Sequence, residues 1–314
     1  IKPATYGSYS NIVHSVIEPY FRQKGYTLRG LEARHIQQFY GERLKTVKPN
    51  SVLHDHAVIH QALKYALKTD LVIQNVATKV DRPRKNEFQP KFLDAEQLQQ
   101  IFEVLKGTWM ELPILVAAFY GLRRGELVGL KWDAIDFERG TITIKHTVTT
   151  TRIDGKTYVL EQESAKTKSS LRTLPLVGSF AAYFRQVKEE QEYNKRICGN
   201  CYDYSYDGYV FVNELGKRIN PNYLTSKFPE YLEQHGLQRI RLHDLRHSCA
   251  SLLLANGVPL KQIQEWLGHS DFSTTANIYA HLDYSSKLSS AQAMTQGLPL
   301  PAADGVKCKW EMQV

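Results

Sequence analysis

The sequence predicts two domains: an all-α basic domain, followed by a mixed α+β domain with a small antiparallel sheet. Three observations lead to this prediction: positive charge concentrated in the first quarter, a polar proline-bearing segment near residue 85, and β-branched runs confined to the second part. Of the 314 residues, 42% are hydrophobic and 23% charged, which is typical of a globular chain and excludes disorder as the main state. No run approaches the ~20 apolar residues of a membrane span.

The first domain is expected to cover residues 1–85. Residues 11–69 have helical character, and Ser51 is the expected N-cap of a helix with apolar residues at helical spacing. Residues 1–88 carry 14 Lys/Arg and 7 Asp/Glu, whereas the rest of the chain carries 26 and 25. Such asymmetry favours contact with a polyanion, most often nucleic acid, although a solvated basic surface is the alternative.

A linker at residues 86–91 separates this part from a second domain at residues 92–284. Asp94 and Gln97 form a capping-box pattern that starts a new helix, and the apolar run 112–120 predicts a buried helix. Strands are expected at residues 141–144, 148–151, 158–160 and 171–174, with a hairpin turn at Asp154-Gly155. Helices are then expected to continue to about residue 282.

The last segment, residues 285–314, is expected to form a helix and a strand. Residues 306–314 alternate apolar and polar side chains, which is the pattern of a half-buried strand. This tail could dock on its own sheet or on the sheet edge of a neighbouring subunit, and both alternatives stay open.

Five polar motifs follow one another along the second domain: GLRRGE at 121–126, KT at 166–167, HDLR at 243–246, LGH at 267–269, and Tyr279. Each alone has a structural explanation, such as a solvated helix-end cation or a turn histidine. Together, in this order, they resemble the tyrosine recombinase (integrase) family, most closely the integrases of conjugative transposons and temperate phages. The resemblance covers the whole second domain and is weaker in the first.

The resemblance implies a site-specific recombinase that cleaves and rejoins DNA through a 3′-phosphotyrosyl intermediate, integrating and excising a mobile element. Phosphoryl transfer needs positive charge on the non-bridging oxygens, and arginine supplies a planar fork that stays protonated. Arg123 and Arg246 are therefore the expected clamp. Tyr279 is the expected nucleophile, because a phenolate can form a reversible phosphate ester, although its ordinary pKa of ~10 requires a base.

The remaining roles are carried over from the family. His243 is the expected base or proton shuttle and His269 a hydrogen-bond donor to the phosphate. Lys166 matches the general-acid lysine that protonates the leaving 5′-oxygen, with Lys168 as the rival. Glu126 matches an acidic residue that orients the site.

No cofactor or metal is expected, since Cys198 and Cys201 supply at most half of a zinc site and no Walker loop is present. Four cysteines indicate a reducing compartment, here the bacterial cytoplasm. The expected partners are double-stranded DNA at core recombination sites, three further copies in a homo-tetramer on two sites, and an accessory excision factor, with no membrane. Because the sequence starts at Ile1, it is expected to lack an N-terminal arm-binding domain. The alternatives are a non-catalytic DNA-binding regulator and a type IB topoisomerase, which only relaxes supercoils.

Overall fold

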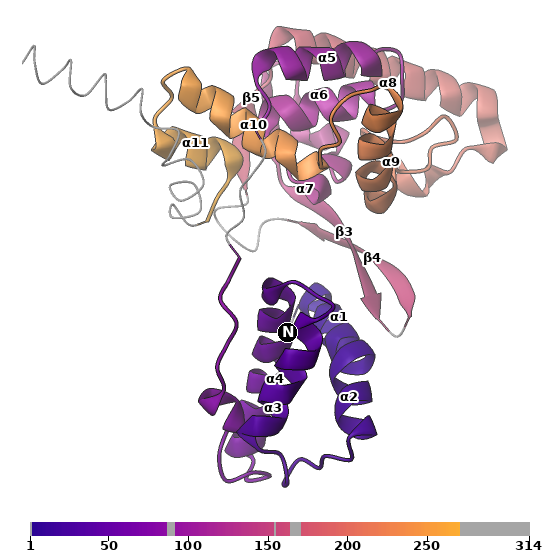
Figure 1. Ribbon diagram of the computed structural model, residues 1–314. Helices are drawn as coiled ribbons and strands as arrows, with labels where there is room; N and C mark the ends of the chain where they lie inside the picture. The colour runs from indigo at the N-terminus through magenta and orange to yellow at the C-terminus, as the bar shows by residue number, and fades with distance from the viewer. Residues whose placement is uncertain (1, 87–91, 154, 164–170, 271–314) are drawn as a thin grey trace, which may run out of the picture.

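The computed structural model describes residues 2–86, 92–153, 155–163 and 171–270. Figure 1 shows a helical N-terminal region, residues 2–86, next to a larger mixed region. The N-terminal region consists of α1 (Pro3–Ile12), the π-helical turn η1 (Val13–Ile17), α2 (Glu18–Gln23), α3 (Ala33–Leu44), α4 (Pro49–Lys68) and the 3-10 turn η2 (Val76–Lys79).

The N-terminal region has its own hydrophobic core. Its buried members come from α3, α4 and η2, and α2 adds aromatic side chains. The rings of Tyr20 and Phe21 lie 4.9 and 5.4 Å from that of Phe39. Helices were predicted here from residue 11, but the first helix already begins at Pro3.

The predicted N-cap of α4 at Ser51 is wrong. The helix begins at Pro49, with Lys48 in the N-cap position. Proline has a fixed φ and no N–H to satisfy, so it suits the first turn of a helix and here sets the N-cap three residues earlier.

The mixed region contains seven α-helices and five strands within its described residues. The α-helices are α5 (Ala95–Leu105), α6 (Glu111–Tyr120), α7 (Arg124–Val128), α8 (Gly178–Cys198), α9 (Pro221–Gln234), α10 (Leu242–Ala255) and α11 (Leu260–Leu267). The strands are β1 (Ile135–Asp136), β2 (Thr141–Ile144), β3 (His146–Ile153), β4 (Lys156–Glu163) and β5 (Arg172–Pro175). Short 3-10 turns lie at η3 (Trp132–Ala134), η5 (Gly199–Cys201) and η6 (Tyr204–Tyr206).

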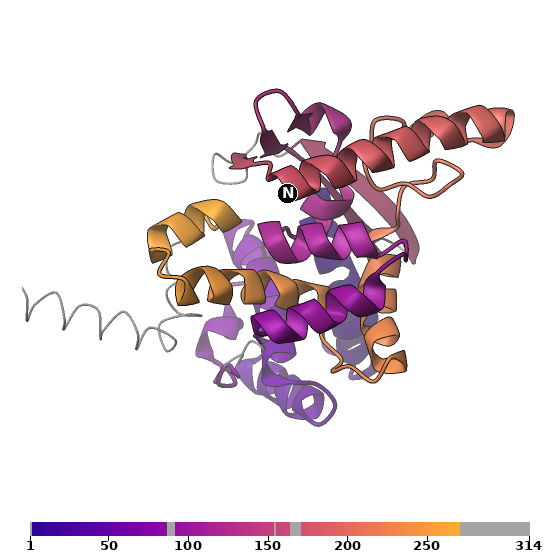
Figure 2. The same ribbon diagram turned by 90° about the horizontal axis from the view of Figure 1, so that it is seen from above.

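Helices α5, α7 and α10 pack against α6, in which seven of the ten residues are buried. Figure 2 shows α6 beside α5 and α10. The predicted capping box at the start of α5 is confirmed, because Asp94 Oδ1 accepts from the Gln97 N–H at 2.8 Å and Gln97 Oε1 accepts from the Asp94 N–H at 3.1 Å. Ser248 Oγ on α10 accepts from the Leu93 N–H at 2.9 Å, which ties α5 to the same layer.

The strands form two antiparallel sheets, where a single small sheet was predicted. One has the order β1-β2-β5, and the other is the hairpin β3-β4. Only Lys145 separates β2 from β3, and the chain leaves the first sheet there. Strand β5 later returns to β2, with Ile142 opposite Leu174. The four predicted strands are present, and the turn of the hairpin includes Gly155 with a φ of 76°.

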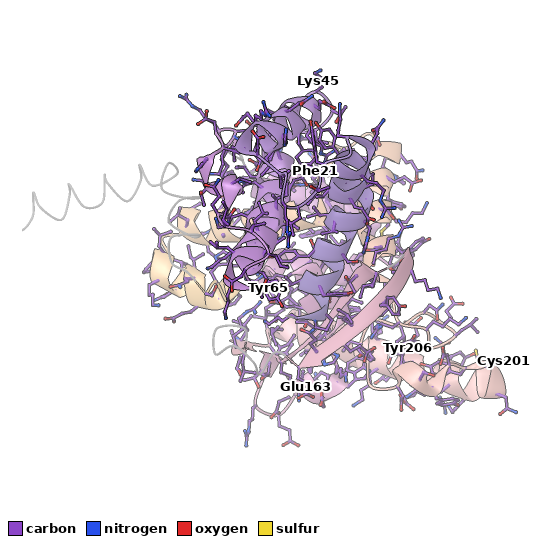
Figure 3. All side chains as sticks on the ribbon, turned by 90° about the horizontal axis from the view of Figure 1, so that it is seen from below. Phe21, Lys45, Tyr65, Glu163, Cys201 and Tyr206 are labelled. Carbon is purple, nitrogen blue, oxygen red and sulfur yellow. The ribbon has the colours of Figure 1, made fainter. Side chains whose placement is uncertain are left out.

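The hairpin reaches from the mixed region to the N-terminal helices (Figures 1 and 3), where α1 packs against β3. Gly7 and Thr151 meet at this contact and are both buried. A Cβ on Gly7 would lie 2.1 Å from Thr151 Oγ1, so only glycine allows this approach. In the part of the chain described, no helix is long and apolar enough to cross a membrane.

Candidate active site

Three of the predicted motifs, GLRRGE, HDLR and LGH, meet at the C-terminus of α11. The helix ends at Leu267 and is capped by Gly268, whose φ of 67° lies in the left-handed region that favours glycine. The last carbonyls of a helix have no partner within it. Here three consecutive carbonyls each accept from a different arginine: Trp266 O from Arg172 Nε at 2.8 Å, Leu267 O from Arg246 Nη2 at 2.7 Å, and Gly268 O from Arg123 Nη2 at 3.0 Å.

Arg123 lies at the N-cap of α7, directly after the end of α6. The turn between these helices depends on Gly121, which has a φ of 61° and where a Cβ would lie 2.4 Å from Leu267 Cδ2. The Arg123 side chain is 40% exposed, and its Nη1 donates to Glu126 Oε1 at 2.8 Å. The guanidinium is therefore fixed on one side and open to solvent on the other.

Arg246 is 2% exposed and is among the largest fully buried side chains of the described residues. Its Nη1 donates to the Gly121 carbonyl at 2.5 Å, so this guanidinium joins the end of α6 to the end of α11. The two predicted clamp arginines thus come from separate helices and are anchored on neighbouring carbonyls.

Glu126 is 4% exposed and lies between two guanidinium groups. Its Oε2 accepts from Arg172 Nη2 at 2.8 Å and from the Arg123 N–H at 3.0 Å. Burial alone would raise the pKa of this carboxyl, but the charges and hydrogen bonds of Arg172, with Arg123 and Arg246 beyond, lower the pKa to about 2. Glu126 is therefore ionised throughout the neutral range.

Three histidines lie around this cluster and have lowered pKa values. Burial, followed by the charges of Arg246 and Arg241, lowers the pKa of His243. Burial and the nearby His243 lower the pKa of His247 to about 4, and the two rings are 4.9 Å apart. Burial, followed by the charges of Arg246 and Arg123, lowers the pKa of His269 to about 3. All three rings are neutral at pH 7, so each offers one donor and one acceptor nitrogen.

The structure brings together Arg123, Glu126, His243, Arg246 and His269. Arg124, the second arginine of the GLRRGE motif, is directed toward α9, where its Nη1 donates to Asn222 Oδ1 at 3.0 Å. Lys166, its rival Lys168 and Tyr279 lie outside the described residues, as does the tail at 285–314.

Arg172 is the member of the cluster that sequence reasoning missed. It begins β5, where alternation buries Arg172 and Leu174 and exposes the residues between and after them. An arginine at an inward position of an alternating strand was the available signal, because a buried arginine needs a carboxylate or carbonyl partner.

The cysteine pair lies far from this cluster. Cys198 ends α8 and Cys201 lies in the turn beyond, at the end of the region opposite α10 and α11 (Figure 3). Among the residues that the structure describes, no three His, Cys, Asp or Glu side chains are placed to hold a metal ion.

The arrangement is suited to an anionic ligand in neutral solution. Arg123 offers such a ligand a partly exposed guanidinium, and the buried Arg246 adds a second fixed positive charge nearby. Neutral imidazoles beside them can accept or donate a proton. Preorganised charges of this kind stabilise negative charge that develops in a transition state.

Comparison with known proteins gives a consistent result. Residues 91–286 match the family described as "Phage integrase family". A "Tyrosine recombinase XerC-like" protein of Caldanaerobacter subterraneus is 30% identical over 93% of this chain and 78% of its own length. The ICEBs1 integrase of Bacillus subtilis is 26% identical over 90% of this chain and 74% of its own.

Two solved structures share the fold. The Tn1549 transposon integrase in complex with a circular intermediate DNA aligns with a TM-score of 0.69 at 18% identity, over 85% of this chain and 86% of that one. Lambda integrase bound to a core site aligns with a TM-score of 0.60 at 16% identity, over 88% of this chain and 89% of that one.

Proposed function

Because the chain belongs to the phage integrase family, whose tyrosine recombinases cleave and rejoin DNA at specific sites, we propose that it integrates and excises a mobile element through a 3′-phosphotyrosyl intermediate. The observation that carries the proposal is the set of arginines on the last carbonyls of α11, which fixes two guanidinium groups for one phosphate. The prediction of the family from sequence is confirmed.

The DNA duplex lies between the two regions, with residues 1–85 as the core-site binding domain on one side and residues 92–284 as the catalytic domain on the other. Residues 86–91 link them. Separate hydrophobic cores and the positive charge of the first region support this division. Affinity comes mainly from phosphate contacts and therefore falls steeply with salt.

The scissile phosphate is held by Arg123 and Arg246, and Glu126 orients Arg123. His243 is neutral, so it can take the proton of the Tyr279 hydroxyl as the phenolate oxygen attacks phosphorus. His269 donates a hydrogen bond to a non-bridging oxygen. Lys166, or Lys168 in its place, gives a proton to the leaving 5′-oxygen.

The first step forms a bond between the tyrosine oxygen and phosphorus and breaks the bond to the 5′-oxygen, which leaves as a hydroxyl. A 5′-hydroxyl from the partner duplex then attacks the phosphotyrosine, and the tyrosine regains its proton. The phosphotyrosyl ester conserves the energy of the broken phosphodiester, so the exchange needs no nucleotide.

Strand exchange requires four copies on two DNA sites, in the bacterial cytoplasm, and excision uses an accessory factor. The tail at 285–314 docks on its own sheet or on a neighbouring copy, and the second alternative gives it a role in assembly. Deletion of residues 304–314 is expected to weaken the pairing of two sites while single-site binding persists. Normal pairing by the truncated chain would show that the tail serves its own fold.

The test begins with selection of the bound core site from random-sequence DNA. A suicide substrate built on that site traps the covalent adduct. The wild-type protein is expected to form it, whereas Tyr279→Phe is expected to bind equally well and form none. An adduct with Tyr279→Phe would show that Tyr279 is not the nucleophile, and Tyr284 would then be the candidate.

Arg123 and Arg124 provide a matched pair for the same assay. Arg123→Gln is expected to lose about 10²–10³ in cleavage rate, the effect of removing one transition-state donor. Arg124→Gln removes the same charge one residue further on and is expected to cleave normally at saturating DNA. Absence of any wild-type adduct would favour a DNA-binding regulator, and relaxation without joining of two duplexes would favour a type IB topoisomerase.

A further inference from the structure

Arg172 is a buried cation that none of the proposed catalytic steps uses. Its side chain is 7% exposed, and it begins strand β5. The side chain of Arg172 is hydrogen-bonded to two helices. Its Nε donates to Trp266 O at the end of α11, and its Nη2 donates to Glu126 Oε2 on α7, both at 2.8 Å.

Arg172 reaches the proposed phosphate clamp through shared partners. Glu126, which it holds, also accepts from the side chain and the backbone N–H of Arg123. The carbonyl that it holds precedes those of Leu267 and Gly268, on which Arg246 and Arg123 are anchored. Arg172 therefore stabilises both supports of Arg123, the carboxylate and the helix end.

We propose that Arg172 is a positioning residue for DNA cleavage, which fixes the Arg123 guanidinium toward the scissile phosphate by holding Glu126 and the end of α11. The inference rests on the proposed recombinase function and adds a residue that acts through another. Because its side chain is 7% exposed and donates to Trp266 O and to Glu126, Arg172 acts through these groups and not on the DNA itself.

The charges explain why this matters. Glu126 carries one negative charge and is shared between Arg172 and Arg123, both positive. Without Arg172 the carboxylate has Arg123 as its remaining direct partner, and that pair becomes tighter. The guanidinium is then drawn toward the carboxylate, and less of its charge acts on the phosphate.

The shape of the guanidinium matters as well as its charge. An arginine fork can donate in two directions at once, whereas a lysine ammonium is a point charge on a flexible stem. Lysine at position 172 keeps the counter-charge for Glu126 but cannot reproduce both contacts in the same geometry. Arg172→Lys is thus expected to lie between the wild type and Arg172→Met.

The test compares two substrates built on the selected core site. One carries the normal phosphodiester, and the other carries a methylphosphonate at the scissile position, which has no negative charge. On the phosphodiester, Arg172→Met is expected to cleave about 10²-fold more slowly at saturating DNA, the cost of a clamp misplaced by about 1 Å. On the methylphosphonate the charge that Arg123 must neutralise is gone, and the defect is expected to shrink to within about fivefold of the wild type.

Arg218→Met is the matched control. Arg218 is also a buried guanidinium, with a side chain that is 5% exposed and paired with Glu161, but it lies at the base of the hairpin and contacts neither α7 nor α11 directly. It is expected to lower stability and leave the cleavage rate at saturation within about threefold of the wild type on both substrates. A control that loses rate as Arg172→Met does would overturn the proposal.

The outcomes separate the two levels of inference. A wild-type protein that leaves no adduct on the phosphodiester defeats the recombinase function. A wild-type adduct with an unchanged Arg172→Met rate, or with the same fractional loss on both substrates, overturns only the role of Arg172. If Arg172→Met does not fold, Arg172→Lys decides by the same comparison, with an expected loss of about tenfold on the phosphodiester and near-normal cleavage of the methylphosphonate.

Discussion

Removal of the negative charge of Glu126 should destabilise the mixed region by an amount that depends on pH in a defined way. Glu126→Gln keeps the size of the side chain but leaves Arg172 buried without its counter-charge. The pKa of Glu126 is lowered from an ordinary 4.5 to about 2. At about 1.4 kcal/mol per pKa unit, this difference corresponds to about 3 kcal/mol of stability at pH 7. Breaking a buried ion pair typically costs a similar ~3–5 kcal/mol.

The sign of the pH dependence follows from the direction of the shift. Because folding lowers the pKa of this carboxyl, its contribution is fully present above pH 4.5 and is lost as the pH falls toward 2. The wild type should therefore be more stable than Glu126→Gln by about 3 kcal/mol at pH 7, and the two should converge as the carboxylate of the wild type becomes protonated. For a region of this size, the difference at pH 7 corresponds to a Tm lower by about 6–12 °C.

Tryptophan fluorescence provides the assay, since none of the four tryptophans lies in residues 1–88. Urea unfolding at several pH values between 7 and 3 gives the free energy difference. Glu138→Gln serves as the control, because that side chain is exposed and should change stability by less than about 0.5 kcal/mol. A difference that stays constant down to pH 3, or one no larger than that of the control, would refute the ionised, doubly paired carboxylate.

Three further predictions concern the reaction. Lys166→Ala should slow cleavage about 10²–10⁴-fold, and the rate should recover on DNA whose 5′-bridging oxygen is replaced by sulfur, a leaving group that needs no proton. Recovery of Lys168→Ala instead would assign the general-acid role to Lys168. Cleavage should persist in EDTA because the two clamp guanidiniums supply the positive charge, and loss of activity that magnesium restores would contradict this. The acid limb of the cleavage pH profile should lie below the ordinary histidine value, because burial and then the charges of Arg246 and Arg241 lower the pKa of His243. Arg241→Gln removes one of these charges and should move that limb to higher pH, and an unmoved limb would argue against His243 as the base.

Local signals predicted much of the fold. The capping box of Asp94 and Gln97 involves residues three apart, and sequence reasoning found it for that reason. The N-cap of α4 is also a local matter: serine favours that position, but Pro49 fixes the first turn and leaves Lys48 as the N-cap. The division into two sheets depends on β5 returning to β2 across the hairpin, and no short-range pattern records such a pairing.

The site shows the same limit. Arg123, His243, Arg246 and His269 were recognised through motifs, and the structure brings them together. Arg172 escaped because its role arises from an ion pair with Glu126, 46 positions earlier in the chain. Such a pairing exists only once α7 and β5 are packed together.

The contact between α1 and β3 has a consequence for how the protein is loaded onto its substrate. The two regions are connected twice, covalently by the chain between them and non-covalently where Gly7 meets Thr151. With a duplex between the regions, protein and DNA are linked like a ring on a thread. The protein can then move onto or off a linear fragment at its ends, but it can leave a closed circle only if this contact opens. Dissociation from circular DNA should accordingly be slower than from a short linear site of the same sequence. The free energy needed to open this helix–hairpin contact sets the size of the difference.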